Sequence, residues 1–435
     1  MTKRQFKENL LRGRGCCMQA LQEDRENYRE VILWACSHSL AFDPQCEGSR
    51  AWYLYQFICC FPDKETFLTA AIDSFRHTRS NGNWKFLYLA ELLNQFSLDG
   101  FSAAQQALWH KYEMLYAQLM KKKLSPGQHF PQRDDFEMLC IILAENKTAF
   151  IKIAEDIGRL YEKKSLYHAY DFLWLYDSRG RYYLTALVRE AMKSRYLEKY
   201  LIISQEYEKV TENRKECRPQ ALPLTGVRLS LRLQRINDPE ALLPYAEAYL
   251  GQREPKARAE ALTAFCRCPY PKDPLPIIKD AKSQYKSLND AAWEALSNIR
   301  HPLVRKFALE ELKGNPNAAL PVLIKNYQEQ DARLLEGHIQ AIPVNFRDTT
   351  GWHGIHLYIL SMKDDRQKAP ASLLSHIYET TYCSCCREYT LYQMGKRRLL
   401  TNKLLQECLF DSNEEIRKYA KRILKRREKS TACNK

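Results

Sequence analysis

Glycine is scarce in this sequence, with 15 residues among 435. That is roughly half of its average usage in proteins. Strands joined by tight turns need glycine, because it adopts positive φ angles without steric cost. A chain that is poor in glycine, yet 45% hydrophobic, favours helices joined by short turns around a substantial core. We therefore expect an all-α protein.

Long apolar runs are also missing. No segment approaches the ~18 consecutive apolar residues of a membrane-spanning helix. The opening segment MTKRQFKENLLRGRG is charged and lacks the apolar stretch of a secretory signal. The 15 cysteines are odd in number and scattered, which is typical of reduced thiols. We therefore expect a cytoplasmic protein that does not bind a membrane.

Motifs of common enzyme classes are absent as well. The sequence contains no G-x-x-x-x-G-K-[ST], no H-E-x-x-H and no G-x-S-x-G, so nothing indicates a P-loop, a metalloprotease or a serine hydrolase. The short GRG at residues 13–15 cannot form a dinucleotide-binding loop. We identify no catalytic residue, metal ligand or cofactor site, and we expect no enzymatic activity.

What the sequence does have is positive charge, with a net charge of +15. Residues 394–435 contain 13 Lys and Arg against 5 Asp and Glu, so over half of the excess lies at this end of the chain. On a helix that begins near Glu414, four cations follow i, i+3, i+4, i+7 spacing and form one stripe, which could bind phosphates. The alternative is a solvated helix end. The candidate polyanion-binding residues are Arg397, Arg398, Lys418, Lys421, Arg422 and Lys425.

Signals for helix starts recur in the second half of the chain. Asp238, Asp273 and Asn315 each precede a proline, an arrangement that favours a helix N-terminus. The starts are 35 and 42 residues apart, close to the ~40–47 residues of a HEAT-type helical pair. A further helical run follows each start and completes a pair. We assign PLVRKFALEEL to the pair that starts at Asp273.

Two runs in this half share the frame [V/I]-R-K-[F/Y]-A, at residues 304–308 and 416–420. Asp411 and Arg417 stand where HEAT repeats have their inter-repeat Asp and Arg, and Arg305 takes the place of Arg417 in its own run. From about residue 235 to 427 the chain resembles HEAT-repeat proteins of the uncharacterised bacterial type, except over residues 351–400. The resemblance implies an α-solenoid of stacked helical pairs and no reaction.

The first half of the chain is helical but less regular. We predict an irregular α-helical region at residues 1–210, a linker at 211–226 that contains prolines and a glycine, and a HEAT-like region at 227–435 that ends in the basic helix. Helical periodicity predicts helices in the first region over residues 28–42, 49–61, 64–78, 84–98, 103–123, 134–146 and 149–164.

Three cysteines fall within four positions, at Cys383, Cys385 and Cys386. A structural zinc ion needs four ligands, usually from two pairs with two to four residues between their members. His376 and Cys408 could add to this cluster, but no second pair repeats the spacing. A metal or redox site is therefore the alternative, and we expect these cysteines to pack as small apolar groups at a helix turn.

Our first hypothesis for function is a non-enzymatic scaffold that binds a protein partner. The second is a nucleic-acid or other polyanion binder that uses the basic surface. The third is a HEAT-like DNA glycosylase, a family that uses an aromatic pair and an acidic residue in a concave groove. Trp293 is the candidate aromatic residue for that activity. The identity of the partner and the oligomeric state stay open.

Overall fold

The described residues of the chain form helices and no strand, which confirms the predicted all-α class. None of these helices is long and apolar enough to cross a bilayer. The computed structural model describes residues 1–79, 84–121, 133–164, 182–216, 239–344, 351–360 and 369–433, and the single residues 175, 233, 346 and 362.

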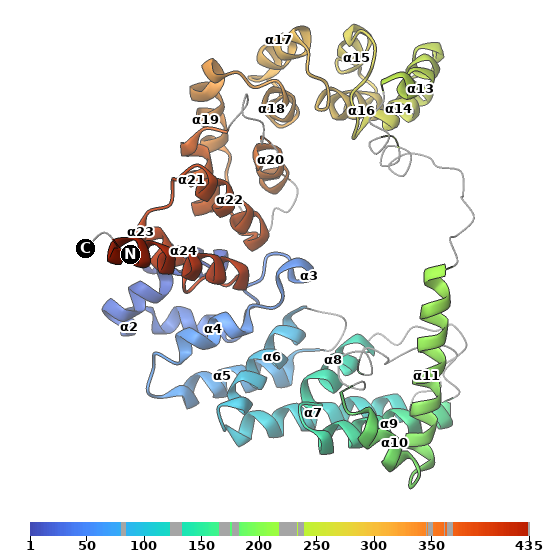
Figure 1. Cartoon of the computed structure of the whole chain (residues 1–435), viewed down its shortest axis with the longest axis vertical. Helices are drawn as coiled ribbons and strands as arrows, with labels where there is room; N and C mark the ends of the chain where they lie inside the picture. The colour runs from blue at the N-terminus through green and yellow to red at the C-terminus, as the bar shows by residue number, and fades with distance from the viewer. Residues whose placement is uncertain are drawn as a thin grey trace. The chain divides into compact units, whose positions relative to one another are not determined.

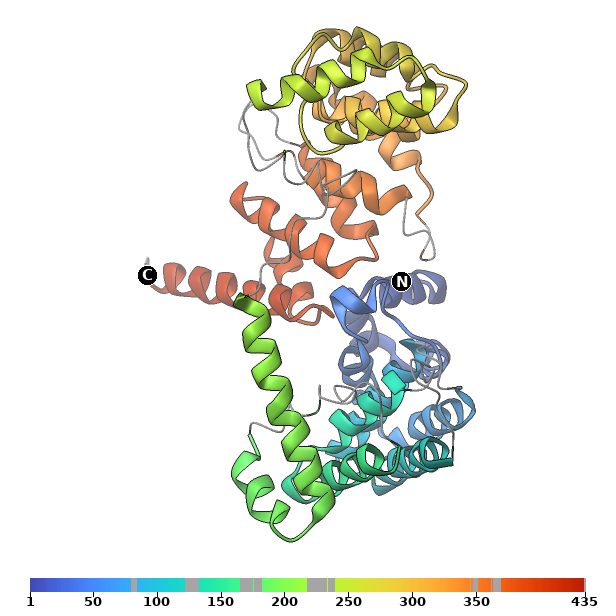
Figure 2. The same ribbon diagram turned by 90° about the vertical axis from the view of Figure 1, so that its right-hand side faces the viewer.

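Contacts divide the chain into two compact units, and unit 1 contains both ends of the chain. It comprises Met1–Pro219 and Thr401–Lys435. Residues 401–435, which the sequence grouped with the repeat region, thus pack with the first half (Figure 1, Figure 2). Its helices are α1 (Lys3–Arg12), α2 (Cys16–Ala35), α3 (Pro44–Glu47), α4 (Ala51–Ile58), α5 (Lys64–His77), α6 (Trp84–Leu98), α7 (Ser102–Lys121), α8 (Arg133–Leu143), α9 (Lys147–Lys164), α10 (Leu184–Ala191), α11 (Arg195–Glu216), α23 (Asn402–Cys408) and α24 (Glu414–Cys433).

Unit 2 comprises Gln220–Leu400. Of the predicted linker, residues 211–216 belong to α11, and residues 217–226 lie outside the described part of the chain. The helices of unit 2 are α13 (Pro239–Gly251), α14 (Pro255–Leu262), α15 (Leu275–Asp280), α16 (Lys286–Leu296), α17 (Pro302–Glu311), α18 (Pro316–Lys325), α19 (Ala332–Ala341), α20 (Gly351–Leu360), α21 (Ala371–Thr380) and α22 (Ser384–Lys396), with short 3-10 helices at Thr263–Phe265 and Glu329–Asp331.

The proline signals mark helix starts as predicted. α13 and α18 begin at Pro239 and Pro316, and α15 begins one residue after Pro274. Proline suits these positions because its fixed φ matches the first helical turn and its missing N–H would have no partner there. At α15, the Asp273 carboxylate accepts a hydrogen bond of 3.0 Å from the Leu275 N–H.

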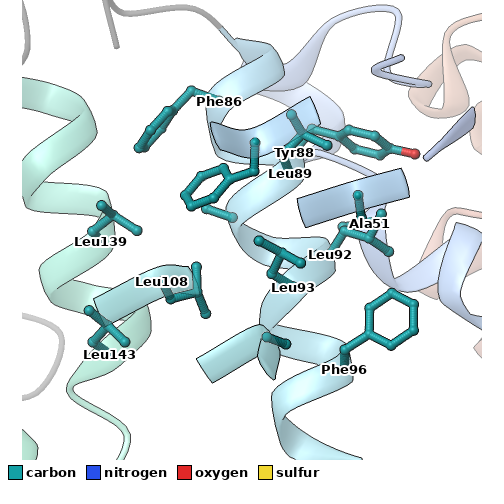
Figure 3. Packing of buried hydrophobic residues seen from close by; sticks show 14 of the residues in the cluster. Ala51, Phe86, Tyr88, Leu89, Leu92, Leu93, Phe96, Leu108, Leu139 and Leu143 are labelled. Atoms are coloured by element: carbon teal, nitrogen blue, oxygen red, sulfur yellow. The ribbon is translucent and has the colours of Figure 1, made fainter. Parts of the chain in front are cut away.

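In unit 1, helices contact their neighbours and the next helix but one. The seven predicted helical runs correspond to α2 and α4 to α9, although α2 begins earlier than predicted and is kinked at Asp24. α6 packs against α4, α5, α7 and α8. It is apolar around most of its circumference, and Figure 3 shows its side chains among those of α4, α7 and α8. A helix of this kind is stable only when it is surrounded by others.

Unit 2 is built from two sets of helices. The even-numbered helices α14 to α22 contact one another in succession, and each odd-numbered helix contacts an even-numbered neighbour. α17 packs on α18 and so opens a new pair. The sequence had grouped α17 with the preceding pair. The difference arises at Pro302, which can begin a helix but cannot continue one, and His301 caps the new N-terminus.

Unit 1 joins the two ends of the chain through a terminal clasp. It is formed by residues 13–15, between α1 and α2, and residues 407–412, at the end of α23 and in the turn that follows. The Ser412 N–H donates a hydrogen bond of 2.8 Å to the Gly13 carbonyl. The Arg14 guanidinium binds both carboxylate oxygens of Glu407, at 2.9 and 3.1 Å. Tyr53 of α4 donates a hydrogen bond of 2.7 Å to the Arg14 carbonyl. The clasp therefore connects α4 to both ends of the chain.

Two glycines make this close approach possible. Gly13 has φ +74° and ends α1 in the left-handed conformation. Gly15 has an ordinary helical φ of −70°, but a Cβ atom at this position would overlap the Glu407 carbonyl oxygen. The GRG sequence therefore serves the contact between the two ends of the chain and needs no nucleotide to explain it.

We expect Gly15→Ala to destabilise unit 1 by about 2 kcal/mol, because the added methyl group must displace the Glu407 backbone. The measurement is the midpoint of urea unfolding followed by circular dichroism. Gly251→Ala is the matched control, since a Cβ atom at Gly251 meets no atom within 4 Å. Equal midpoints for Gly15→Ala and the wild type would contradict this account of the clasp.

Candidate functional site

The basic helix α24 begins at Glu414 as predicted. The Asn413 side chain caps it and accepts hydrogen bonds from the Glu415 N–H at 2.8 Å and the Ile416 N–H at 3.3 Å. Ile416 and Ala420 are fully buried, so the first turns of α24 pack against the rest of unit 1. From residue 421 to 429 no side chain is buried, and in Figure 2 the end of α24 projects from unit 1. The cations of this part therefore face solvent.

The predicted stripe on α24 is not uniform. Lys418 forms ion pairs of 2.9 Å with both Glu414 and Glu415, which raise its pKa to about 12. In the described part of the chain, Lys421, Arg422 and Lys425 form no ion pair, although Arg422 lies 5.3 Å from the ring centroid of Tyr419. These three exposed cations are thus the ones available to an anionic partner.

Arg397 and Arg398, the other candidates for polyanion binding, belong to unit 2 rather than to the unit of α24. Arg397 donates a hydrogen bond to the Ala369 carbonyl. Arg398 is exposed and has φ +58°, a left-handed conformation that is uncommon for a residue with a side chain. Arg397 thus connects α22 to the segment that precedes α21.

Arg417, in the first turn of α24, lies beside Asp411, which precedes this helix. The Arg417 guanidinium donates to the carbonyl oxygens of Asp411, at 2.6 Å, and Ser412, at 3.0 Å. It also lies 4.1 Å from the ring centroid of Trp52 on α4, and its burial lowers its pKa. The Asp411 carboxylate is fully buried and accepts a bond from the Asn413 N–H at 2.9 Å. Both side chains therefore stabilise the turn.

Arg305 occupies the fourth position of α17, as Arg417 does in α24, but its partner differs. It forms a bidentate ion pair with Asp331, which precedes α19, and one bond measures 3.1 Å. Arg258, in the fourth position of α14, binds Asp280 at the end of α15 and the Tyr249 hydroxyl. Sequence reasoning missed Arg258 and both aspartates. The signal for Arg258 was the recurrence of arginine in the fourth position of α14, α17 and α24.

The cysteine cluster is brought together in unit 2 with a residue that the sequence did not single out. Cys383 and Cys386 lie beside His353 of α20, and the three ligand atoms are within 4.8 Å of one another. Cys408, which the sequence offered as a further ligand, is on α23 in unit 1. The interval of two residues between Cys383 and Cys386 was the available signal.

Trp293, the candidate for a glycosylase groove, lies on α16 and is 7% exposed. Its ring stacks on Phe307 of α17 at a centroid distance of 4.9 Å. A ring that packs in the interior cannot also stack on a base, so Trp293 contributes to the core of unit 2.

No protein-family model, curated protein or solved structure matches the chain. The resemblance to HEAT repeats therefore depends on the sequence pattern and on the helix contacts of this chain alone.

We expect the Arg305–Asp331 pair to contribute a coupling free energy of about 2 kcal/mol. Its side chains are only 18% and 5% exposed, so substitution of one residue leaves the charge of the other buried without its partner. The measurement is a double-mutant cycle of unfolding with Arg305→Ala and Asp331→Asn. The exposed pair Lys306–Glu310 on the same helix is the control, with an expected coupling below about 0.5 kcal/mol. Similar couplings for the two pairs would contradict the prediction.

Proposed function

We propose that the chain is a non-enzymatic α-solenoid of HEAT-like helical pairs that binds a protein partner along an extended helical surface. The observation that carries this proposal is the packing in unit 2. Helices α14, α16, α18, α20 and α22 contact one another in succession, and α13, α15, α17 and α21 each pack on the helix that follows. Stacks of this kind present one continuous surface, on which successive pairs repeat the same features.

The Arg–Asp pairs support the same proposal. Arg258–Asp280 joins α14 to α15, and Arg305–Asp331 joins α17 to the start of α19. Each of these ion pairs therefore connects one pair of helices to the next. Interactions between successive repeats are what determines the stability of a repeat array, because each repeat contacts only its neighbours.

A row of exposed leucines offers the binding surface. Leu275, Leu303 and Leu334 lie in the first turns of α15, α17 and α19, and all three are exposed. Short connections between helices usually reverse the direction of the chain, so we expect the first turns of these three helices to lie at the same end of unit 2. Single exposed leucines need no explanation. A recurrence in every second helix from α15 to α19 fits a partner that presents apolar side chains, such as an amphipathic helix.

We expect the triple substitution of Leu275, Leu303 and Leu334 by Ser to weaken partner binding at least about tenfold, because it removes apolar area from the interface. Crosslinking in cells followed by mass spectrometry identifies the partner, and titration calorimetry with the purified partner gives the dissociation constant.

The matched control replaces Leu98, Val188 and Met192 by Ser, since these apolar residues of unit 1 are also exposed, at 63%, 45% and 81%. The control should bind like the wild type. Unchanged binding by the leucine variant, or an equal loss in the control, would exclude the leucine row as the interface.

The second candidate function is polyanion binding through α24. The observation that favours it is that Lys421, Arg422 and Lys425 are exposed and form no ion pair with any residue that the structure describes. Phosphate contacts by such cations release counterions and make the affinity depend on salt. The buried position of Trp293 gives no support to the glycosylase alternative.

We expect that, if α24 binds polyanions, the triple Gln substitution of Lys421, Arg422 and Lys425 reduces the slope of log K against log salt by about 2 to 3 for a single-stranded oligonucleotide. Lys418→Gln should change the slope less, because Lys418 already has two carboxylate partners. Fluorescence anisotropy across a salt series gives both values. Absence of binding by the wild type at low salt would eliminate this candidate.

A cytoplasmic location is part of the proposal. Cys59 is an exposed thiol that forms no disulfide with another described residue. Thiols of this kind persist in a reducing compartment.

A further inference from the structure

The first turn of α22 brings thiols together with an imidazole from another helix. Cys383 is the N-cap residue of α22, and Cys386 lies in its first turn. His353 comes from α20, which packs on α22. The ligand atoms of these three residues lie within 4.8 Å of one another, and both cysteines are 4% exposed. No comparable group occurs elsewhere among the described residues.

Cys385 adjoins this group. Its side chain and those of Cys386 and His353 hydrogen-bond to the Cys383 thiol. Two further thiols and an imidazole therefore surround the Cys383 sulfur, and these are the groups that bind soft metals.

We propose that Cys383, Cys386 and His353 bind a zinc ion, with Cys385 as the fourth ligand. Three thiolates and one imidazole form one of the common ligand sets of structural zinc. Two residues separate Cys383 from Cys386, which is the spacing of a zinc-binding pair. Soft thiolate ligands select zinc over magnesium or calcium, which prefer oxygen.

The zinc ion would crosslink α20 to α22, two helices that are separated in sequence by α21 but contact each other directly. The local backbone is arranged for this role, because the Thr390 hydroxyl donates to the Cys386 carbonyl at 2.7 Å and the Arg387 N–H donates to the Cys383 carbonyl at 3.1 Å. These bonds fix the turn that carries the thiols. The site is independent of any partner of the leucine row or of α24.

A dithiol redox pair is the principal competitor, since two residues also separate the cysteines of such pairs. A redox pair uses two sulfur atoms, whereas here an imidazole lies within 4.8 Å of both sulfur atoms and a third thiol adjoins Cys383. Formation of a Cys383–Cys386 disulfide is therefore an outcome that the test must detect.

The test begins with the full-length chain, purified under reducing conditions without a metal-affinity column. Mass spectrometry of the metals should find about one zinc per chain. Replacement by Co²⁺ should give intense visible absorption and a thiolate-to-cobalt charge-transfer band, which report tetrahedral sulfur coordination directly. This second measurement does not depend on any variant.

Variants then assign the ligands. Cys383→Ser, Cys386→Ser and His353→Ala should each weaken zinc binding at least ~100-fold, and Cys385→Ser at least ~10-fold. Cys268→Ser is the matched control, because Cys266 and Cys268 have the spacing of Cys383 and Cys385 but belong to no such group among the described residues. Circular dichroism establishes that each variant is folded.

Removal of zinc by a chelator should increase hydrogen exchange in α20 and α22 and leave α6 and α7 of unit 1 unchanged. The proposal is overturned if the wild type holds no zinc and gives no cobalt spectrum. It is equally overturned if a Cys383–Cys386 disulfide forms while zinc is present, or if Cys268→Ser loses as much zinc as Cys383→Ser.

Discussion

The ion pair between Arg14 and Glu407, with the backbone contact beside it, is the constraint on which unit 1 depends. It joins residues that are 393 positions apart in the chain. Both side chains are largely buried, so neither charge can lose its partner cheaply. Around this pair, Arg417 stacks on Trp52 and Tyr53 binds the Arg14 carbonyl. The basic helix α24 is therefore presented to solvent from a fixed base.

Unit 2 obtains its order from repetition instead of from one long-range contact. Prolines set the starts of α13, α17 and α18, and arginines in the fourth positions of α14 and α17 bind aspartates of the next pair. Each of these interactions joins residues that are a few dozen positions apart at most. The contacts that stabilise unit 2 are therefore local in sequence. The thiol and imidazole group in the last pairs adds a local crosslink of a different chemical kind.

Helix class and helix starts could be predicted from the sequence because they depend on local chemistry, such as the Asn315–Pro316 cap and the apolar run of α6. The start of a new helical pair at Pro302 does not follow from the 35- and 42-residue spacing of the helix starts. It follows from the proline, which cannot continue a helix. The meeting of residues 13–15 with residue 407 could not be predicted, since no local pattern encodes a contact across the whole chain. His353 was missed for the same reason, because the Cys-x-x-Cys spacing indicates a pair but does not reveal which helix supplies the third group.

The discontinuity of unit 1 has a consequence for biosynthesis. Residues 401–435 leave the ribosome after unit 2, so the surface of α2 that receives α23 stays uncovered while all of unit 2 is being translated. Unit 2 is continuous in sequence and can fold as soon as it emerges, whereas the first part of unit 1 must wait for residues 401–435. At ~5–20 residues per second, this interval lasts roughly ten seconds or more, and it creates a window in which chaperones would be expected to hold the N-terminal helices.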